Sequence, residues 1–160
     1  MRIDQTILAS DPKRLGNCVS ACVATYLGIP LERVPHFVEL GSDLAGEHTN
    51  PSAWWWTLVG FMAGHGLWPY ELERVDQGEP GEVLFVAGPS ERGVAHQVLY
   101  RDGALWHDPH PSKAGLLAVT EVLAWRHARH DHTPTPTVWR DDVCPWHPSS
   151  VEALDRTGGA

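Results

Sequence analysis

Apolar side chains near the start of the chain recur at the spacing of an α-helix. Asn17 is a favourable N-cap residue, and Gly28 followed by Pro30 is a helix stop signal. The pattern therefore predicts a helix from about residue 17 to residue 27, with one apolar face. That face consists of Val19, Cys22, Val23, Tyr26 and Leu27.

The segments around this helix show weaker patterns. Residues 1–16 read as an extended lead-in, and Leu31 to Val34 as a short turn. A polar connection that contains glycine follows, at about residues 41–50. Ser52 can then cap a second helix, at about residues 53–63, which ends before two glycines.

The second half of the chain has the pattern of strands. The short apolar run at residues 83–87 reads as a buried strand. Residues 93–100 and 104–108 form two further strand candidates, joined by a three-residue hairpin loop with Gly103 in the left-handed conformation. The amphipathic spacing from Val119 to Arg126 predicts a final helix.

The chain has the size and composition of one folded domain. Its 160 residues are 42% hydrophobic and 20% charged, which is enough apolar side chain for a core. We expect a single domain over residues 1–148 and a flexible tail over residues 149–160. Because helices precede an antiparallel sheet along the chain, the sequence predicts an α+β fold.

Charge and hydropathy argue against several classes of function. Asp and Glu outnumber Lys and Arg by 20 to 12, with a formal net charge of −8 and no basic stripe, so we expect no nucleic-acid partner. The longest apolar stretches, around residues 53–63, fall short of the ~20 residues that cross a bilayer, so we expect no membrane partner. The N-terminus has an early acidic residue and no apolar segment, which argues against a signal peptide and predicts a cytoplasmic protein.

The cysteines supply a candidate nucleophile. Three cysteines without a secretory signal argue against a disulfide framework. Cys18 directly follows the predicted N-cap, in the first helical turn, where unpaired backbone amides and the helix dipole stabilise a thiolate. Cys22 lies one turn later and is expected to face the core as an inert apolar residue.

The predicted hairpin places a histidine opposite a carboxylate. With Asp102 in the middle of the loop, His96 pairs with Asp108 across the two strands. Directly opposed side chains share one face, with Cβ atoms about 5 Å apart. Asp108 can then accept a hydrogen bond from one ring nitrogen of His96, which leaves the other nitrogen for a thiol. The alternative is a hairpin with a polar face and no catalytic role.

Several stretches together resemble the papain-like cysteine peptidase superfamily, and more closely its small bacterial and phage members. These members have a Gly-Asn-Cys helix start and a later His…His-Asp-Pro-His-Pro segment. The resemblance covers about residues 4–117. The matching stretches are Asp4-Gln5-Thr6, Gly16-Asn17-Cys18 to Ala24, Ile29-Pro30 to Pro35, and Ala95-His96 to Pro111.

The resemblance implies a papain-like fold, with an N-terminal helix packed on an antiparallel β-sheet. It implies Cys18 as nucleophile, His96 as general base and then general acid, and Asp108 as the residue that orients His96. The superfamily also has an oxyanion-stabilising glutamine before the cysteine. Gln5 is the glutamine that precedes Cys18 here, at a longer interval than is usual, and Asn17 is an alternative donor.

The expected function is thiol-dependent acyl chemistry on an amide or peptide bond, without a cofactor. A thioester on Cys18 would be resolved by water, giving hydrolysis, or by an amine, giving acyl transfer. The partner is a peptide, a protein or a small amide substrate. Candidates for lining the substrate groove are Trp54, Trp55 and Trp106.

Two other classes of function stay open. His127, His130, His132 and Asp131 cluster near the C-terminus, with Cys144 and His147 further on, and such side chains can bind zinc. A solvated His-rich segment is the favoured interpretation, and we expect no metal. The chain could also be a non-catalytic interaction module on a papain-like scaffold, because a fold does not fix a function.

Overall fold

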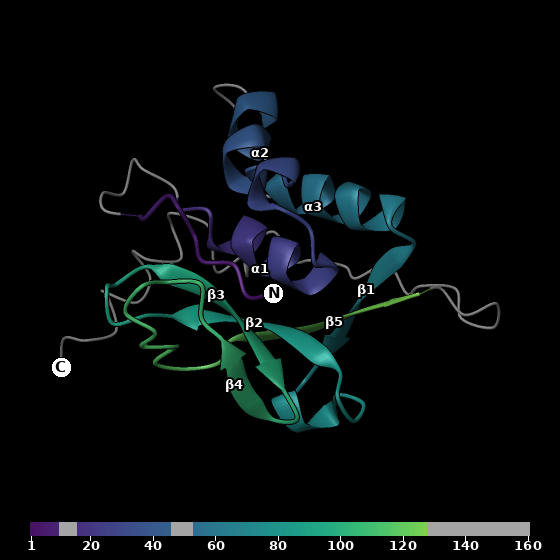
Figure 1. The fold of residues 1–160 in the computed structure, drawn as a ribbon, viewed down its shortest axis with the longest axis vertical. Coiled ribbons are helices and arrows are strands. Elements are labelled where there is room, and N and C mark those ends of the chain that lie inside the picture. The colour runs from purple at the N-terminus through teal and green to yellow at the C-terminus, as the bar shows by residue number, and fades with distance from the viewer. Residues whose placement is uncertain (10–15, 46–52, 128–160) are drawn as a thin grey trace, which may run out of the picture.

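The computed structural model describes residues 1–9, 16–45 and 53–127 of the chain. These residues form three α-helices followed by a five-stranded antiparallel sheet (Figure 1). The α+β class predicted from the sequence is therefore confirmed. The predicted domain boundary at residue 148 and the predicted tail lie outside the described residues.

The first helix forms where the sequence predicts it. Helix α1 (Cys18–Leu27) has Asn17 as its N-cap residue and ends at Gly28, whose φ of 67° is left-handed. A residue without a Cβ adopts this conformation at little cost, so glycine suits the helix end. The short turn expected next is a 3₁₀-helix, η1 (Leu31–Arg33).

A second helix occupies part of the segment that was expected to be a polar connection. Helix α2 (Phe37–Ala45) contains Gly41 and packs on α3 (Ala53–Gly64). A Cβ built on Gly41 would lie 2.4 Å from the Trp54 backbone, so only glycine lets the two helix backbones approach this closely. Gly41 therefore lies at a helix crossing and not in the loop that the sequence predicts.

The five strands form one sheet in the order β1-β5-β2-β3-β4, and every neighbouring pair is antiparallel. The predicted strand and hairpin are confirmed as β2, β3 and β4. The strands are β1 (Leu67–Leu72), β2 (Val83–Pro89), β3 (Ala95–Arg101), β4 (Ala104–His107) and β5 (Glu121–His127).

The final helix expected from Val119 to Arg126 is wrong, because most of this segment is strand β5. Strand β5 lies between β1 and β2, inside the sheet, and is buried on both faces. Its apolar residues therefore form an almost continuous run, and such a run does not distinguish a buried strand from a helix. Strand β1 was not predicted; it contains Pro69, which an edge strand tolerates.

The turn between β3 and β4 is shorter than expected. Asp102 and Gly103 both have a left-handed φ, 51° and 76°, and Arg101 pairs directly with Ala104. The loop therefore has two residues and not three. One residue further along β4 the register shifts, so that Trp106 has no partner on β3 and forms a β-bulge.

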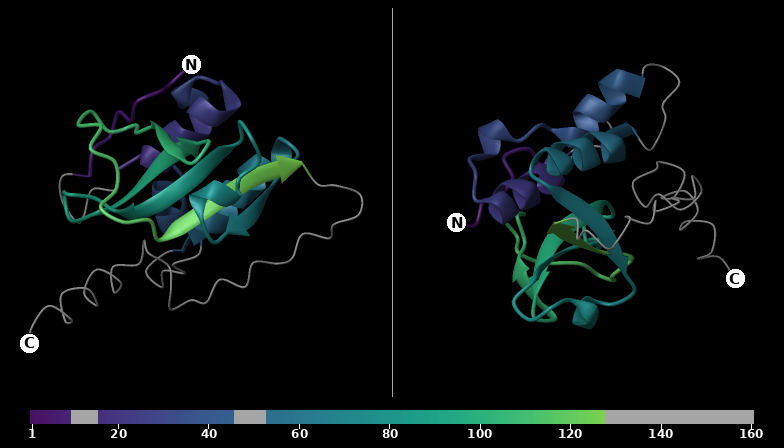
Figure 2. Two further views of the ribbon diagram at one scale, coloured as in Figure 1. Left: turned by 90° about the horizontal axis from the view of Figure 1, so that it is seen from below. Right: turned by 90° about the vertical axis from the view of Figure 1, so that its right-hand side faces the viewer.

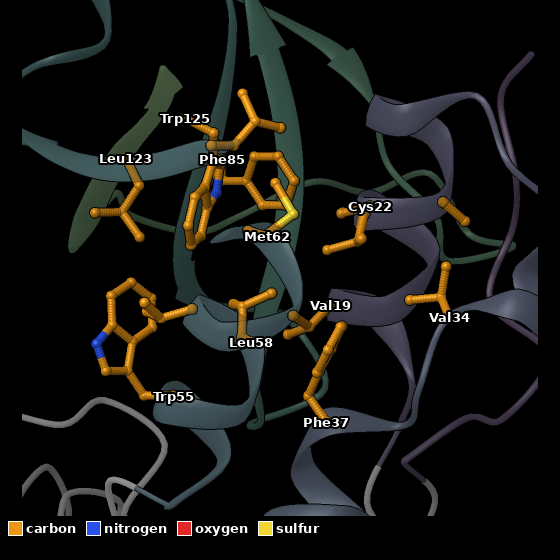
Figure 3. Close-up of a cluster of buried hydrophobic side chains, with 14 of the residues drawn as sticks. Val19, Cys22, Val34, Phe37, Trp55, Leu58, Met62, Phe85, Leu123 and Trp125 are labelled. Carbon is orange, nitrogen blue, oxygen red and sulfur yellow. The ribbon is translucent and has the colours of Figure 1, made fainter. Parts of the chain in front are cut away.

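The helices cover one face of the sheet (Figure 2). Helix α1 lies against β3 and α3 lies against β1, whereas α2 packs on α3. The main core fills the space between the two layers, and a smaller apolar cluster lies on the other face of the sheet. Figure 3 shows the main core, with Met62 of α3 near Phe85 and Trp125 of the sheet, and Val19 of α1 near Leu58 of α3 and Phe37 of α2.

Within the described ranges, no helix has both the length and the apolar character required to cross a membrane.

Candidate active site

Cys18 is the first residue of α1 and follows the N-cap Asn17 directly. The residue is 6% exposed. The N–H groups of a first helical turn have no partners within the helix, and the positive end of the helix dipole lies there, so this position stabilises negative charge. Helix α1 then packs along β3, the strand that carries His96.

The imidazole of His96 interacts with both other members of the predicted triad. Its Nε2 lies 2.7 Å from Asp108 Oδ1, and both side chains are at most 2% exposed. The Cys18 side chain lies close enough to the same ring to raise its pKa. Because Nε2 is engaged by Asp108, Nδ1 is the ring atom left for the thiol. The structure thus brings the three residues together from a helix, a strand and the loop after β4.

Three hydrogen bonds hold the carboxylate of Asp108. Oδ1 also accepts from the backbone N–H of His110 at 2.8 Å, and Oδ2 accepts from the backbone N–H of Gly115 at 2.8 Å. The bond to His110 is an Asx turn, in which an aspartate bonds the backbone two residues on. The two backbone hydrogen bonds therefore fix the orientation of the carboxylate that contacts the imidazole.

These contacts decide the charge state of the pair. Burial by itself lowers the pKa of His96, but its hydrogen bond to Asp108, its interaction with the Cys18 side chain and the nearby negative charges raise that pKa to about 9. Burial by itself raises the pKa of Asp108, but hydrogen bonds from His96, His110 and Gly115 hold it well below its ordinary value. At neutral pH the pair is therefore an imidazolium and a carboxylate.

Gln5 lies beside the start of α1, despite its distance from Cys18 along the chain. Its Nε2 donates to the carbonyl oxygen of Ile7 at 3.1 Å, and the N–H of Asn17 donates to the same oxygen at 3.1 Å. Gln5 is 8% exposed, and its Oε1 has no partner among the described protein groups. A side-chain amide carries two N–H donors, so Gln5 keeps one donor next to the residue that precedes Cys18.

The side chain of Asn17 has a different role from the one expected. It makes no cap hydrogen bond to α1. Its Oδ1 accepts from the N–H groups of Thr6 at 3.1 Å and Ile7 at 3.0 Å, and its Nδ2 donates to Thr6 Oγ1 at 3.0 Å. Asn17 therefore fastens the N-terminal segment to the helix start, which leaves Gln5 as the better placed of the two oxyanion candidates.

The three candidate groove tryptophans lie in different surroundings. Trp55 is 5% exposed and packs on Trp125 with ring centroids 5.9 Å apart, which places it in the core and not on a groove. Trp54 packs edge-on against Trp55, with centroids 6.1 Å apart. Trp106 is partly buried, and the Arg2 guanidinium lies 5.0 Å from its ring centroid. Of the three, Trp106 lies on the hairpin of His96 and Asp108.

Two further residues near the triad have structural partners. Cys22 is fully buried, its Sγ–H donates to the Gln97 carbonyl at 3.5 Å, and burial, with the nearby charges of Cys18 and Asp108, raises its pKa. The expectation of an inert Cys22 in the core agrees with this environment. His107 is buried, and its Nε2 lies 2.8 Å from the Ile3 carbonyl oxygen.

The structure offers no metal centre in the part of the chain that it describes. Within residues 1–9, 16–45 and 53–127, no group of three or more His, Cys, Asp or Glu side chains could hold a metal ion. His127 ends β5, with its Nδ1 3.0 Å from the Gly66 carbonyl oxygen. The other members of the suggested zinc cluster, His130, Asp131, His132, Cys144 and His147, lie outside the described residues.

Sequence reasoning missed the groups of the loop after Asp108. Gly115 supplies an N–H to the carboxylate, and the Nζ of Lys113 donates to the Asp108 carbonyl oxygen at 2.8 Å. The Asp-Pro start of this loop is a turn signal that could have predicted the Asx turn at His110. No local pattern indicates the contacts of Lys113 and Gly115, because they depend on how the whole loop closes.

Comparison with known proteins does not assign the chain to a family. No family model matches it, and comparison with curated proteins and with solved structures gives no match. The geometry of Cys18, His96 and Asp108 is therefore the basis on which a function can be assigned.

Proposed function

We propose that this chain is a thiol-dependent hydrolase or acyltransferase that acts on an amide or peptide bond, on a papain-like fold. The observation that carries the proposal is the buried His96–Asp108 hydrogen bond of 2.7 Å, with Cys18, at a helix start, close enough to the same imidazole to raise its pKa. A thiol, a base and a group that orients the base are the components of nucleophilic thiol catalysis.

Burial of this pair supports a role beyond packing. The imidazole and the carboxylate are both almost fully buried, and removing two charges from water is costly. Apolar side chains of similar volume would fill the same space without that cost. Such pairs with perturbed pKa values gather at functional sites, and this pair directly adjoins a thiol.

Acylation would begin at the Cys18 sulfur. The thiolate attacks the substrate carbonyl carbon and forms a C–S bond, and the carbonyl oxygen becomes an oxyanion. The His96 imidazolium then gives the Nδ1 proton to the leaving nitrogen, the C–N bond breaks, and a thioester on Cys18 and a free amine result. The raised pKa of His96, about 9, keeps that proton available at neutral pH.

Deacylation would reuse the imidazole as a base. Neutral His96 removes a proton from water or from an acceptor amine, whose oxygen or nitrogen attacks the thioester carbon. The C–S bond breaks, Cys18 leaves as the thiolate, and His96 is again the imidazolium that Asp108 stabilises. Water gives hydrolysis and an amine gives acyl transfer.

Two donors are the candidates to stabilise the oxyanion. One is the backbone N–H of Cys18, at the first position of α1. The other is the second Nε2 hydrogen of Gln5, whose amide shares the Ile7 carbonyl with the backbone of Asn17. Removal of one such donor costs about 10²–10³ in rate in acyl-transfer enzymes.

Two reagents test this proposal on the purified chain. Iodoacetamide alkylates a thiolate without forming an oxyanion, whereas p-nitrophenyl acetate acylates it through a tetrahedral oxyanion and releases coloured p-nitrophenolate. We expect a burst of p-nitrophenolate equal to the protein concentration, and an acetyl group mapped to Cys18 by mass spectrometry. Cys22→Ser is the matched control and should keep the burst, while Cys18→Ser should lose it.

The opposite result would favour a binding module. If Cys18→Ser and the unmodified chain release p-nitrophenolate at the same rate, the site has no acyl chemistry. If His96→Ala acylates as fast as the unmodified chain, Cys18 is not activated by the imidazole. Either result would contradict the proposed function, and a non-catalytic interaction module on this scaffold would then explain the fold better.

A further inference from the structure

The N-terminal segment lies against the loop that carries Asp108. The backbone N–H of Gln5 donates to the Pro109 carbonyl oxygen at 3.0 Å. The Nε2 of His107 lies 2.8 Å from the Ile3 carbonyl oxygen. The segment that presents Gln5 is thus bonded to the residues on both sides of Asp108.

The same segment is also fastened to helix α1. The N–H of Ile3 donates to Thr25 Oγ1 at 2.8 Å. The Asn17 side chain bonds the backbone of Thr6 and Ile7. The segment therefore bridges the helix that carries Cys18 and the loop that carries Asp108, and Gln5 lies in the middle of the bridge.

The ammonium group of Lys113 links the N-terminal segment to the loop that carries Asp108. Its Nζ forms an ion pair with the Asp4 carboxylate, next to Gln5, and donates to the Asp108 carbonyl oxygen at 2.8 Å. Its backbone holds a left-handed φ of 52°, and its N–H donates to the His110 carbonyl oxygen at 3.0 Å. One ammonium group thus binds the neighbour of the oxyanion donor and the backbone of the triad carboxylate.

We propose that Lys113 is a positioning residue that fixes Gln5 relative to the triad. This inference rests on the proposed function, because it assigns Lys113 a role in stabilising the oxyanion. Lys113 touches neither Cys18 nor a reacting atom. It holds the segment that carries the oxyanion donor against the loop that carries Asp108, so the donor and the His96–Asp108 pair keep one fixed geometry.

The contacts predict which step depends on Lys113. The Asp108 carboxylate keeps its bonds from His96, His110 and Gly115 when Lys113 is replaced, so alkylation of Cys18 should continue. Gln5 loses the charged anchor at its neighbour Asp4. Because small displacements of a catalytic group cost up to about 10² in rate, and the backbone bonds of the segment remain, we expect an intermediate loss of about tenfold.

The test compares acylation by p-nitrophenyl acetate with alkylation by iodoacetamide in Lys113→Met, Lys113→Arg and Asp4→Asn. Arg101→Met is the matched control, because Arg101 is 47% exposed like Lys113 and lies 4.0 Å from Asp102 on the same hairpin. We expect acylation to fall about tenfold in Lys113→Met and in Asp4→Asn, with alkylation within about twofold of the unmodified chain. Lys113→Arg should restore most of the acylation, and the control should change neither rate.

Three results would overturn the inference. Unchanged acylation in Lys113→Met would show that the ion pair positions nothing. Equal losses of acylation and alkylation, without rescue by arginine, would show a general structural role. No acylation of Cys18 in the unmodified chain would remove the proposed function and this inference with it, and that result is distinguishable because it requires no Lys113 variant.

Discussion

His96 and Asp108 meet at 2.7 Å although the hairpin does not place them directly opposite each other. The pairing of Leu99 with His107, continued by one residue, sets Asp108 across from Val98. His96 is two residues from Val98 and so shares its face, which makes Asp108 a diagonal neighbour of His96. Diagonal side chains on one face remain within reach of each other.

The bulge at Trp106 makes this contact geometrically possible. With the two-residue turn alone, Asp108 would lie opposite Gln97 and would face away from His96, because a shift of one residue moves a side chain to the other face of the sheet. The bulge shifts the register of β4 on β3 by one more residue. This returns the Asp108 side chain to the face of the sheet that carries His96. The turn and the bulge together therefore set the orientation of the triad carboxylate.

The charge of Asp108 should control the titration of His96. In Asp108→Asn the imidazolium loses its negative partner while its burial stays, and burial lowers the pKa of histidine. We expect the His96 midpoint, about 9 in the unmodified chain, to fall by two pH units or more. NMR titration of the imidazole protons, with His96→Gln to assign the signal, measures this shift. A midpoint that stays in place would show that Asp108 does not stabilise the imidazolium.

The same pair should make folding stability depend on pH. The pKa of His96 is raised to about 9, so its contribution is complete below its ordinary pKa of 6.5 and is lost as pH rises through 9. The pKa of Asp108 is lowered, so its contribution is lost only in acid below its ordinary pKa of 3.8. Between pH 6.5 and pH 9 we expect the free energy of unfolding of the unmodified chain to fall by about 1 kcal/mol or more relative to that of His96→Gln. This corresponds to a fall in Tm of roughly 3 °C.

Thermal unfolding followed by circular dichroism at several pH values between 6 and 10 measures this difference. His65→Gln removes an exposed histidine after α3 and serves as the control. If the Tm difference between the unmodified chain and His96→Gln is the same at both ends of the range, His96 carries no stabilising charge in the fold.

Gln5 should affect acylation without affecting alkylation. Gln5→Ala removes the side-chain amide beside the start of α1 but leaves the His96–Asp108 pair in place. Since only acylation passes through an oxyanion, we expect the rate with p-nitrophenyl acetate to fall about 10²-fold and the rate with iodoacetamide to change less than about twofold. Gln77→Ala, an exposed glutamine of the 3₁₀-helix η2 (Val75–Gln77), should change neither rate. Equal acylation in Gln5→Ala would exclude Gln5 from the oxyanion site.

A glycine should be required at position 88 of β2, because the backbone of Ala118 passes close to it. Gly88 pairs with His96 on β3, and a Cβ built on it would lie 1.9 Å from the Ala118 carbonyl oxygen. Because this Cβ has no space, we expect the free energy of unfolding of Gly88→Ala, measured in urea, to be lower by about 2 kcal/mol. Gly60→Ala is the matched control: nothing lies within 4 Å of its Cβ position in α3, so alanine should stabilise the helix by up to about 1 kcal/mol. Equal effects of the two substitutions would contradict the close approach at Gly88.

Elements with strong local signals could be predicted from the sequence. Gly28 marks the end of α1 through a left-handed backbone conformation that glycine favours, and Asn17 stands at the N-cap position although its side chain makes no cap hydrogen bond. Asp102-Gly103 marks the hairpin turn for the same reason. Cys18, His96 and Asp108 could be found because each lies at or next to one of these well-marked elements.

Other parts of the fold depend on contacts that are distant in sequence. Gly41 reads as a loop residue until α3 lies against it, and Pro69 argues against a strand until β1 is known to be at the edge of the sheet. The sequence of strand β5 resembles that of a helix because burial on both faces removes the alternation that identifies a strand. The partners of Lys113 and the bulge at Trp106 belong to the same class, since neither has a local pattern.

The most direct test of the account is the rate at which iodoacetamide alkylates Cys18 at about pH 6, well below the ordinary thiol pKa of about 8.5. Mass spectrometry assigns the modified cysteine in the unmodified chain, in His96→Ala and in the control His65→Ala, which removes an exposed histidine. We predict alkylation confined to Cys18, about 10²-fold slower in His96→Ala and little changed in His65→Ala. Equal rates in the unmodified chain and His96→Ala would show that His96 does not maintain a thiolate, and would contradict the account.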